Sequence, residues 1–341
     1  MNAFTHLASK SNANQDYESA APGVKESELR IKGRPTMVPS VEIDGQTVVA
    51  TGQWLRVAEV RDEELVDGST MHDPNSFIRL LRTSGLGADI FTFAQRLPDV
   101  AAKYGYHKEY DSIAAVPITA YSQWWKHRTE YSVRKGVNRA KKLGVVAKVV
   151  DFSDELLEGM CRIYNETPVR QGKKFWHFGK DVQSIRCALA TFLERSVFVG
   201  AYYQEHLIGF MKLTWVGSAG VITQILSMKQ HFDKRPNNLM IAKGVELCEQ
   251  NGKSYFIYGK FVYLDPDSSL TEFKRRSGFE SISVPRYYIP LTFKGRLAVR
   301  LRLYRGILGS IPKPVLHYTL KMRKIWLERQ LERPAKAKAA P

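Results

Sequence analysis

The segment of residues 197–279 constrains the fold most, because strand-like and helix-like runs follow one another in it in a fixed order. Three runs are rich in β-branched and aromatic residues and are predicted to be strands: VFVGAYY, LIGFMKLTW and GVITQILSM. A helix, a strand and a last helix are then predicted at NNLMIAKGVELCEQNG, SYFIYGK and SLTEFKRRSGF. This alternation predicts an α/β fold, in which helices flank a mixed central sheet.

The chain has 341 residues, more than one domain usually contains, and its sequence divides into four segments. Residues 1–38 are polar and are predicted to be disordered. Residues 39–130 form a small αβ lobe, with a hairpin turn at Asp44-Gly45 and further strands at 54–60, 89–94 and 112–118. Helices are expected at 75–81 and near 99–104. Residues 131–292 form the second lobe, and residues 293–341 a basic amphipathic helical extension.

Composition favours a reduced, cytoplasmic protein. The three cysteines lie far apart without CxxC spacing, so neither a disulfide nor a metal site is expected. The N-terminal residues lack the pattern of a signal peptide, and no apolar run approaches the roughly 20 residues that span a bilayer. The formal net charge of +17 favours an anionic partner.

A helical stretch is predicted over residues 121–143, with a strand at 145–150 and helices at 154–166 and 181–193 on its C-terminal side. Five Lys or Arg residues fall within positions 134–142, more than a helix end needs to offset its dipole. Arg134, Asn138 and Lys142 recur every fourth residue and share a face. We expect this face, together with Arg139, either to contact an anionic substrate or simply to be solvated.

The loop of residues 165–180, NETPVRQGKKFWHFGK, collects polar and aromatic side chains between two predicted helices. Glu166 or His177 could accept a proton from an attacking amine or hydroxyl. Arg170 could hold a carboxylate or a phosphate. The loop supplies three further candidates for substrate binding: Gln171, Trp176 and Lys180. Alternatively, the loop is a surface connection whose aromatic residues pack down.

Two further positions could bind a ligand or could be ordinary structural features. A helix begins at Arg235-Pro236-Asn237-Asn238, where free backbone N–H groups could receive an anionic part of a donor, although Pro and Asn are also common at helix starts. Tyr258-Gly259-Lys260 ends a buried strand. The glycine there either lets a ligand approach or makes a simple bend, and Lys260 projects beyond the strand.

The segment FKRRSGF carries three consecutive cations, Lys274, Arg275 and Arg276. Successive helical residues point about 100° apart, so the three cannot all face one pocket. Lys274 adjoins the apolar Phe273 and is the strongest candidate to contact a substrate. A capping or solubilising role is the alternative.

These segments resemble the GNAT acyltransferase superfold, and within it the FemABX-like branch of acyl and aminoacyl transferases that act on cell-envelope precursors. The resemblance rests on VRKGVNRAKKLGV, NNLMIAKGVELCEQNGKSYFIYG and SLTEFKRRSGF, and it covers roughly residues 132–291. DIFTFAQRLPD and IYNETPVRQG are similar to an uncharacterised bacterial group of GNAT-like proteins. The resemblance implies two GNAT-like lobes, the first small or degenerate, and a Lys274 that faces substrate phosphates or a developing oxyanion.

The chain departs from acetyl-CoA enzymes of this fold, which usually carry glycines where the central helix begins. KRPNNLM has none, and FemABX-like members that also lack them take an aminoacyl-tRNA. The resemblance therefore implies an acyl-CoA or aminoacyl-tRNA co-substrate and no tightly bound cofactor.

The resulting hypothesis is a transferase that acylates an amine or hydroxyl of an anionic acceptor, such as a cell-envelope or exopolysaccharide precursor, with tRNA as its only nucleic-acid partner. From Lys294 to Lys338 the tail carries thirteen Lys or Arg against two Glu. Such a tail could lie on the inner face of an anionic membrane, pack on the lobe, or hold RNA. The competing hypothesis is a non-catalytic, degenerate GNAT protein that binds RNA or a membrane surface. The sequence does not indicate an oligomeric state.

Overall fold

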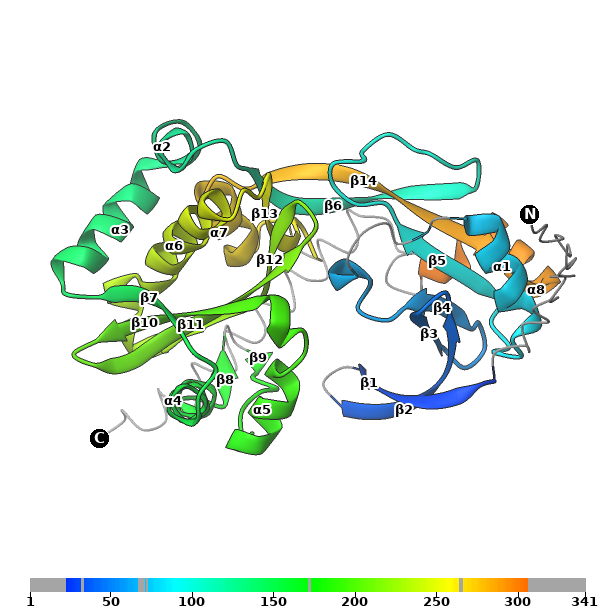
Figure 1. Ribbon diagram of the computed structural model, residues 1–341, viewed down its shortest axis with the longest axis horizontal. Coiled ribbons are helices and arrows are strands. Elements are labelled where there is room, and N and C mark those ends of the chain that lie inside the picture. The colour runs from blue at the N-terminus through cyan, green and yellow to red at the C-terminus, as the bar shows by residue number, and fades with distance from the viewer. Residues whose placement is uncertain are drawn as a thin grey trace, which may run out of the picture.

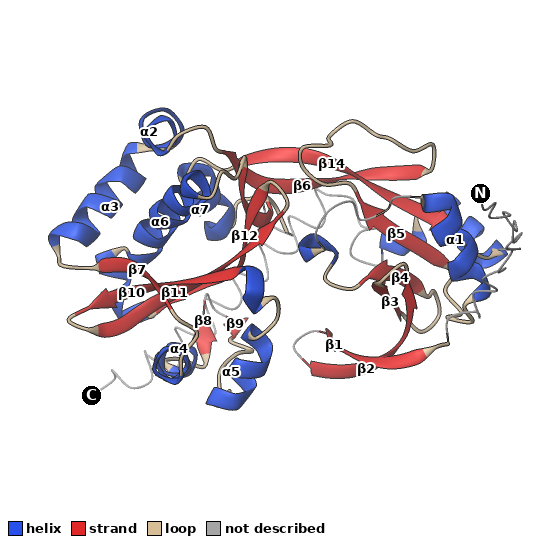
Figure 2. Ribbon diagram, in the orientation of Figure 1, coloured by secondary structure: helices blue, strands red, loops and turns tan. Residues whose placement is uncertain are grey.

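One twelve-stranded sheet runs through both lobes of the described chain, and helices lie on its faces (Figures 1 and 2). The computed structural model describes residues 23–31, 34–66, 71, 73–170, 173–263 and 266–305. From edge to edge the strand order is β1, β2, β3, β4, β5, β14, β6, β13, β12, β11, β10, β7. The predicted mixed α/β architecture with flanking helices is confirmed.

The first lobe is built around a bent sheet and one short helix. Its elements are β1 (Lys25–Ile31), β2 (Arg34–Ile43), β3 (Gln46–Thr51), β4 (Val57–Val60), the 3₁₀ turn η1 (Glu63–Leu65), α1 (Pro74–Thr83) and β5 (Ile90–Ala94). Helix α1 begins where it does because the Asp73 carboxylate accepts hydrogen bonds from the backbone of Asn75 and Ser76. Phe77 of α1 stacks on Phe91 of β5, which places the core of this lobe under α1.

The second lobe has helices on both faces of its sheet. In chain order its elements are α2 (Tyr121–Gln123), the π-helix η2 (Trp124–Arg128), α3 (Tyr131–Lys142), β7 (Val146–Val150), α4 (Asp154–Asn165), the short pair β8 (Val169–Arg170) and β9 (Lys173–Lys174), α5 (Val182–Leu189), η3 (Leu193–Arg195), β10 (Ser196–Tyr203), β11 (His206–Val216), β12 (Ala219–Ser227), η4 (Lys229–Lys234), α6 (Pro236–Gln250), β13 (Tyr255–Lys260) and α7 (Ser269–Arg276).

The two faces of the second lobe have separate cores. Side chains of α3 and α6 pack with Met211 and Phe256 on one face, and those of α4 and α5 pack with Phe210 on the other. Figure 1 shows α3, α6 and α7 on one side of the sheet and α4 and α5 on the opposite side. Alternate residues of β11 therefore face different cores, as the period of a strand requires.

Two long strands join the lobes. β6 (His107–Pro117) pairs with β13 of the second lobe, and β14 (Glu280–Pro290) pairs with both β6 and β5 of the first. After β14 come α8 (Phe293–Arg300) and the turn η5 (Leu303–Arg305). The C-terminal part of the second-lobe sequence thus completes the sheet of the first lobe.

Several predicted elements are confirmed, among them the Asp44-Gly45 hairpin, α1, β5, α4, α6 and α7. Three predictions were wrong. Residues 25–31 and 34–38, expected to be disordered, lie in β1 and β2, whose backbones pair with each other and whose Val38 is buried. Residues 99–104 form no helix, because the carbonyls of Asp99 and Ala101 accept from the Gln95 side chain. The helix expected over 121–143 is interrupted at Thr129 and Glu130, where Arg134 binds the Thr129 carbonyl. Residues 1–22 lie outside the described part.

Candidate active site

An open gap separates β12 and β13 in the second lobe. The two strands are parallel and pair only from Ala219 to Val221 and from Tyr255 to Ile257, and beyond these residues they diverge. The half of β12 that does not pair with β13, from Thr223 to Leu226, is half-buried, whereas its first half is buried. A diverging parallel pair leaves backbone groups free on the inner edge of the gap, so a chain-like ligand can bind there.

The first lobe repeats this arrangement, but its gap is filled by protein. β4 and β5 pair in parallel from Val57 to Glu59 and from Ile90 to Thr92. Where they diverge, the buried carboxylate of Glu63 accepts the backbone N–H of Ala94 at 2.6 Å. The next residues of η1 reach the other lobe, since Arg195 donates to the Leu65 carbonyl at 2.5 Å.

Lys274 lies beside the open gap and is fully buried. Its ammonium lies 4.5 Å from the ring centre of Tyr258 and 4.8 Å from that of Tyr263, and it donates a hydrogen bond to the Lys260 carbonyl at 2.7 Å. No carboxylate of the described chain pairs with it, and burial lowers the pKa of Lys274 to about 8. A buried cation that no described carboxylate neutralises is typical of a functional site.

Gly259 and Tyr263 hold this cluster together. Gly259 has a φ of +56°, and a Cβ there would lie 2.4 Å from the Tyr263 hydroxyl. The glycine is therefore required for the close approach of Tyr263, while its predicted role in admitting a ligand stays a prediction. Burial raises the pKa of Tyr258, so both phenols stay neutral at physiological pH.

A chain of ion pairs connects this cluster with the first lobe. Lys260 Nζ lies 3.0 Å from Asp111, and Arg286 Nε lies 2.6 Å from the same carboxylate. Arg286 also binds Glu63 at 2.8 Å, the residue that fills the gap of the first lobe. Burial opposes ionisation of Asp111, but Arg286 and Lys260 outweigh it and lower its pKa. The network therefore carries fixed charges at the junction of the lobes.

Glu59 of β4 is the unpaired carboxylate near this network. Its side chain is solvent-exposed, and no hydrogen bond or ion pair joins it to another described residue. Nevertheless the pKa of Glu59 is raised, because the surrounding protein limits hydration of its carboxylate and Glu63 and Glu64 repel its charge, effects that Arg286 and Lys260 only partly offset. A raised pKa makes this carboxylate a better proton acceptor than an ordinary glutamate.

The start of α6 lies at the end of β12 and gathers cations from two elements. Arg235 is exposed in a left-handed conformation, and α6 has no side-chain cap. Arg139 of α3 donates to the Asp233 carbonyl at 3.0 Å, which brings the basic helix to this point. A Cβ on Gly136 would lie 3.2 Å from the Asn238 side chain, so α3 and α6 are in close contact. The buried Asn237 Oδ1 has no hydrogen-bond partner.

Not all of the predicted basic face is free. Arg134 is half-buried and donates to the carbonyls of Trp125 and Thr129, so its guanidinium fixes the turn before α3. Asn138 and Lys142 are exposed on α3. Arg139, expected to act together with this face, contacts the turn before α6 through the Asp233 carbonyl.

The predicted catalytic loop lies on the opposite face of the sheet from Lys274. Glu166 pairs with Arg170 at 3.0 Å and accepts the backbone N–H groups of Lys229 and Gln230, so both side chains are occupied in fixing the end of β12. Arg170 also donates to the Ser227 carbonyl at 2.8 Å. Of the aromatic residues expected to pack down in this loop, Phe175 packs against the core of this face, whereas Trp176 and Phe178 are exposed.

His177 is buried in the same loop and stacks on Tyr164 at 4.7 Å. Lys180 Nζ lies 3.0 Å from its Nδ1 and 4.8 Å from the ring centre of the exposed Trp176. Gln171 lies outside the described residues. Glu166, His177 and Lys274 thus do not form one constellation, and their predicted catalytic roles stay predictions.

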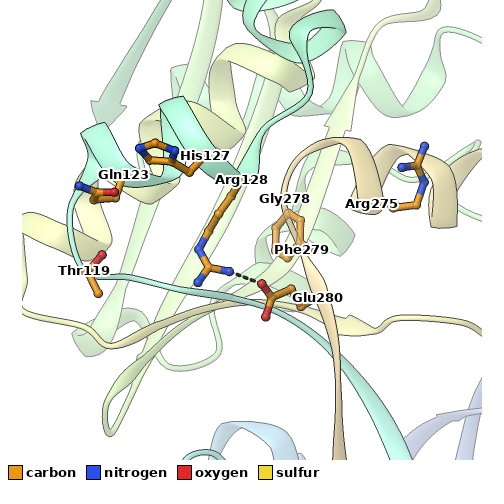
Figure 3. Close-up of a pocket in the computed structure, with 8 residues that line it drawn as sticks. All are labelled: Thr119, Gln123, His127, Arg128, Arg275, Gly278, Phe279 and Glu280. Atoms are coloured by element: carbon orange, nitrogen blue, oxygen red, sulfur yellow. Dashed lines mark hydrogen bonds and ion pairs between the residues drawn. The ribbon is translucent and has the colours of Figure 1, made fainter.

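A second hollow of about 510 Å³ lies between η2 and the turn from α7 to β14 (Figure 3). Its cations are neutralised, since Arg128 pairs with Glu280 and Arg275 pairs with Glu130 and Glu272. Arg275 faces this hollow whereas its neighbour Lys274 is buried, so the consecutive cations do point in different directions. The balanced charges make this hollow a weaker candidate than the gap.

Sequence reasoning missed Glu59, Glu63, Asp111, Tyr263 and Arg286. Each lies on a different strand or loop, and no local motif connects them. One sequence signal could have identified Glu59: it is an ionisable residue in a strand that is otherwise apolar, VAEV of β4. In the described residues no group of His, Cys, Asp or Glu could hold a metal ion.

No protein-family model matches the sequence, and no curated protein matches it significantly. Solved structures do. FemX has a TM-score of 0.56 and 13% identity, over 81% of this chain and 91% of that chain. L-PGS from Bacillus licheniformis has a TM-score of 0.50 and 14% identity, over 77% and 87%. This chain therefore has a GNAT-like, FemABX-related fold.

Proposed function

We propose that this chain is an acyl- or aminoacyltransferase that moves its group from a thioester or ester donor to an amine or hydroxyl of an anionic acceptor. The open gap between β12 and β13, with the buried Lys274 at its side, is the observation that carries the proposal. The FemX-like fold supports it, and the cations Lys260 and Arg286 at the junction of the lobes suit an acceptor with phosphate or carboxylate groups, such as a cell-envelope precursor.

In the proposed reaction the donor carbonyl lies in the gap and the acceptor enters from the junction of the lobes. The nucleophile attacks the carbonyl carbon, a new C–N or C–O bond forms, and the C–S or C–O bond to the donor breaks. Lys274 stabilises the negative charge that develops on the carbonyl oxygen or on a substrate phosphate. Glu59 accepts the proton that the nucleophile loses, and the departing thiolate or alkoxide takes up a proton in turn.

The start of α6 bears on the choice of donor. Pro236 has no N–H, and the Asn238 side chain fills the space against Gly136, so fewer backbone groups face a pyrophosphate than a glycine-rich turn would offer. Arg139, Arg235 and the α6 dipole still favour an anion there. These features suit the ester-linked group of an aminoacyl-tRNA better than acetyl-CoA, and both donors belong in the test.

The experiment is single-turnover transfer from labelled acyl-CoA or aminoacyl-tRNA to UDP-linked and lipid-linked acceptors, with donor-induced thermal stabilisation measured in parallel. Lys274→Met and Glu59→Gln should each slow transfer at least 100-fold while donor binding persists. Glu26→Gln, at an exposed strand position of β1, is the matched control and should transfer normally. If a donor stabilises the protein but both variants transfer at the wild-type rate, this site is not catalytic. If no donor binds or reacts, the transferase proposal is wrong.

A further inference from the structure

Helix α8 lies at the far end of the first lobe (Figure 1), and its outer face is apolar and basic and has no partner among the described residues. Its inner face is fixed to the sheet, because Ala298 and Val299 are buried against Ile90 of β5 and Tyr288 of β14. Gly295 is in such close contact that a Cβ would lie 1.9 Å from the Asp89 carbonyl oxygen. The helix is therefore held rigidly, and its outer face is not free to fold inward.

The start of α8 is fastened by one carboxylate. Asp89 accepts hydrogen bonds from the Thr292 hydroxyl at 2.9 Å and from the Arg56 backbone at 3.0 Å, and its carboxylate lies 2.8 Å from Lys294 Nζ. Burial opposes ionisation of Asp89, but these contacts outweigh it and lower its pKa. Lys294 also donates to the Trp54 carbonyl at 2.7 Å, which places the β3–β4 loop beside the helix.

Large apolar side chains on the outer side of α8 recur every fourth residue. Phe293 is 77% exposed, Leu297 50% and Leu301 57%, and Trp54 in the adjoining loop is 64% exposed. Residues four apart lie on one helix face, so the three form a continuous stripe. An apolar stripe on a rigid helix is an energetically unfavourable surface in water unless it has a partner.

The charges beside this stripe are all of one sign. Residues 293–305 contain five Lys or Arg and no Asp or Glu. Lys294 and Arg305 are paired with Asp89 and Glu109. Arg296, Arg300 and Arg302 are exposed and form no ion pair with the described residues. The surface thus combines exposed leucines and an aromatic ring with three available guanidinium groups.

We propose that this face of α8, with Trp54, docks the protein on an anionic phospholipid bilayer. Apolar side chains would enter the boundary between headgroups and acyl chains while the arginines contact lipid phosphates, as in interfacial amphipathic helices. Leucines at two of the three stripe positions favour lipid over RNA, because an RNA surface uses stacking rings. No helix of the described chain is long and apolar enough to cross a membrane. Docking does not depend on the transfer reaction proposed above.

The test is co-sedimentation of the full chain with phosphatidylcholine vesicles that contain or lack phosphatidylglycerol. Binding should require phosphatidylglycerol and weaken with salt. Leu297→Gln with Leu301→Gln should reduce binding about tenfold per leucine, and replacing Arg296, Arg300 and Arg302 by Gln should reduce it on the order of 100-fold. Leu193→Gln, at an exposed position of the second lobe, is the matched control and should bind normally. Circular dichroism confirms that each variant is folded.

Three results would overturn the proposal. If both sets of variants bind vesicles as the wild type does, the membrane contact lies elsewhere in the chain. If the wild type ignores vesicles but is retained by single-stranded RNA through the same arginines, the surface is a nucleic-acid site. If the wild type is a dimer that the leucine variants convert to a monomer, and neither binds vesicles, the stripe is an interface between two copies of this chain.

Discussion

The buried ammonium of Lys274 makes stability depend on pH in a way that one substitution can isolate. Burial lowers its pKa from 10.5 to about 8 in the folded chain, and unfolding restores ordinary hydration. Below about pH 8 both states carry the proton, and the charged form costs the folded chain about 3 kcal/mol at 1.36 kcal/mol per pKa unit. Above that pH the unfolded chain binds more protons, so stability rises with pH up to the unfolded pKa.

Lys274→Met removes the charge and keeps an unbranched side chain between Tyr258 and Tyr263. From about pH 7.5 to about pH 9.5 the wild type should gain about 2 kcal/mol of unfolding free energy relative to this variant. Urea denaturation of both proteins at the two pH values measures the difference, in which other titrating groups cancel. Lys141→Met, at an exposed position of α3, is the control and should run parallel to the wild type. If the unfolding free energies of Lys274→Met and the wild type change with pH in parallel, Lys274 is not a buried cation without a neutralising partner.

Three further substitutions test contacts elsewhere in the fold. Gly259→Ala places a Cβ 2.4 Å from the Tyr263 hydroxyl at a residue with φ +56°, so it should lower the free energy of unfolding by about 1–2 kcal/mol, measured with heat or urea. Displacement of Tyr263 should also expose Lys274 to acylating reagents. An unchanged Lys274 reactivity would contradict the role of Tyr263. Glu63→Gln leaves Arg286 with one carboxylate and should lower the free energy of unfolding, measured by urea denaturation, by about 2 kcal/mol. Glu26→Gln, at an exposed position, should leave this free energy unchanged. Gly295→Ala drives a methyl group into the Asp89 carbonyl, so it should lower the free energy of unfolding by about 3 kcal/mol or detach α8 from the sheet. Detachment would appear as new protease cleavage near residue 295. A variant that is as stable as the wild type and equally resistant to protease would show that α8 packs loosely.

Local patterns predicted the elements that carry their own signals. The Asp44-Gly45 turn, the helix at 75–81, and the strand–helix–strand order from residue 197 onward are all confirmed. Each depends on residues adjacent in sequence, whose conformational preferences act before any tertiary contact forms. The predictions failed at β1 and at Thr129, where strand pairing and the Arg134 side chain decide the backbone.

The candidate site was predicted in part. Lys274, Tyr258 and Lys260 were identified because they lie at the end of a recognisable strand and helix, and the structure brings them together. Glu166 and His177 were chosen because they share a polar loop, but the loop packs on the other face of the sheet. Nearness in sequence indicated a common site, and the alternation of faces along the sheet separated the residues.

The sequence by itself determined an α/β chain of GNAT-like element order with a basic C-terminal segment, because periodicity and turn residues are local properties. Only the tertiary structure decided which gap is open. Glu63 closes the one in the first lobe, while β12 and β13 diverge freely in the second. It alone brought Asp111 and Arg286 into one network with Lys260, whose carbonyl Lys274 binds, because Arg286, Asp111 and Lys260 lie on strands that are neighbours in the sheet and remote along the chain. Strand pairing between distant segments depends on the packing of the whole molecule, and no short stretch of sequence encodes it.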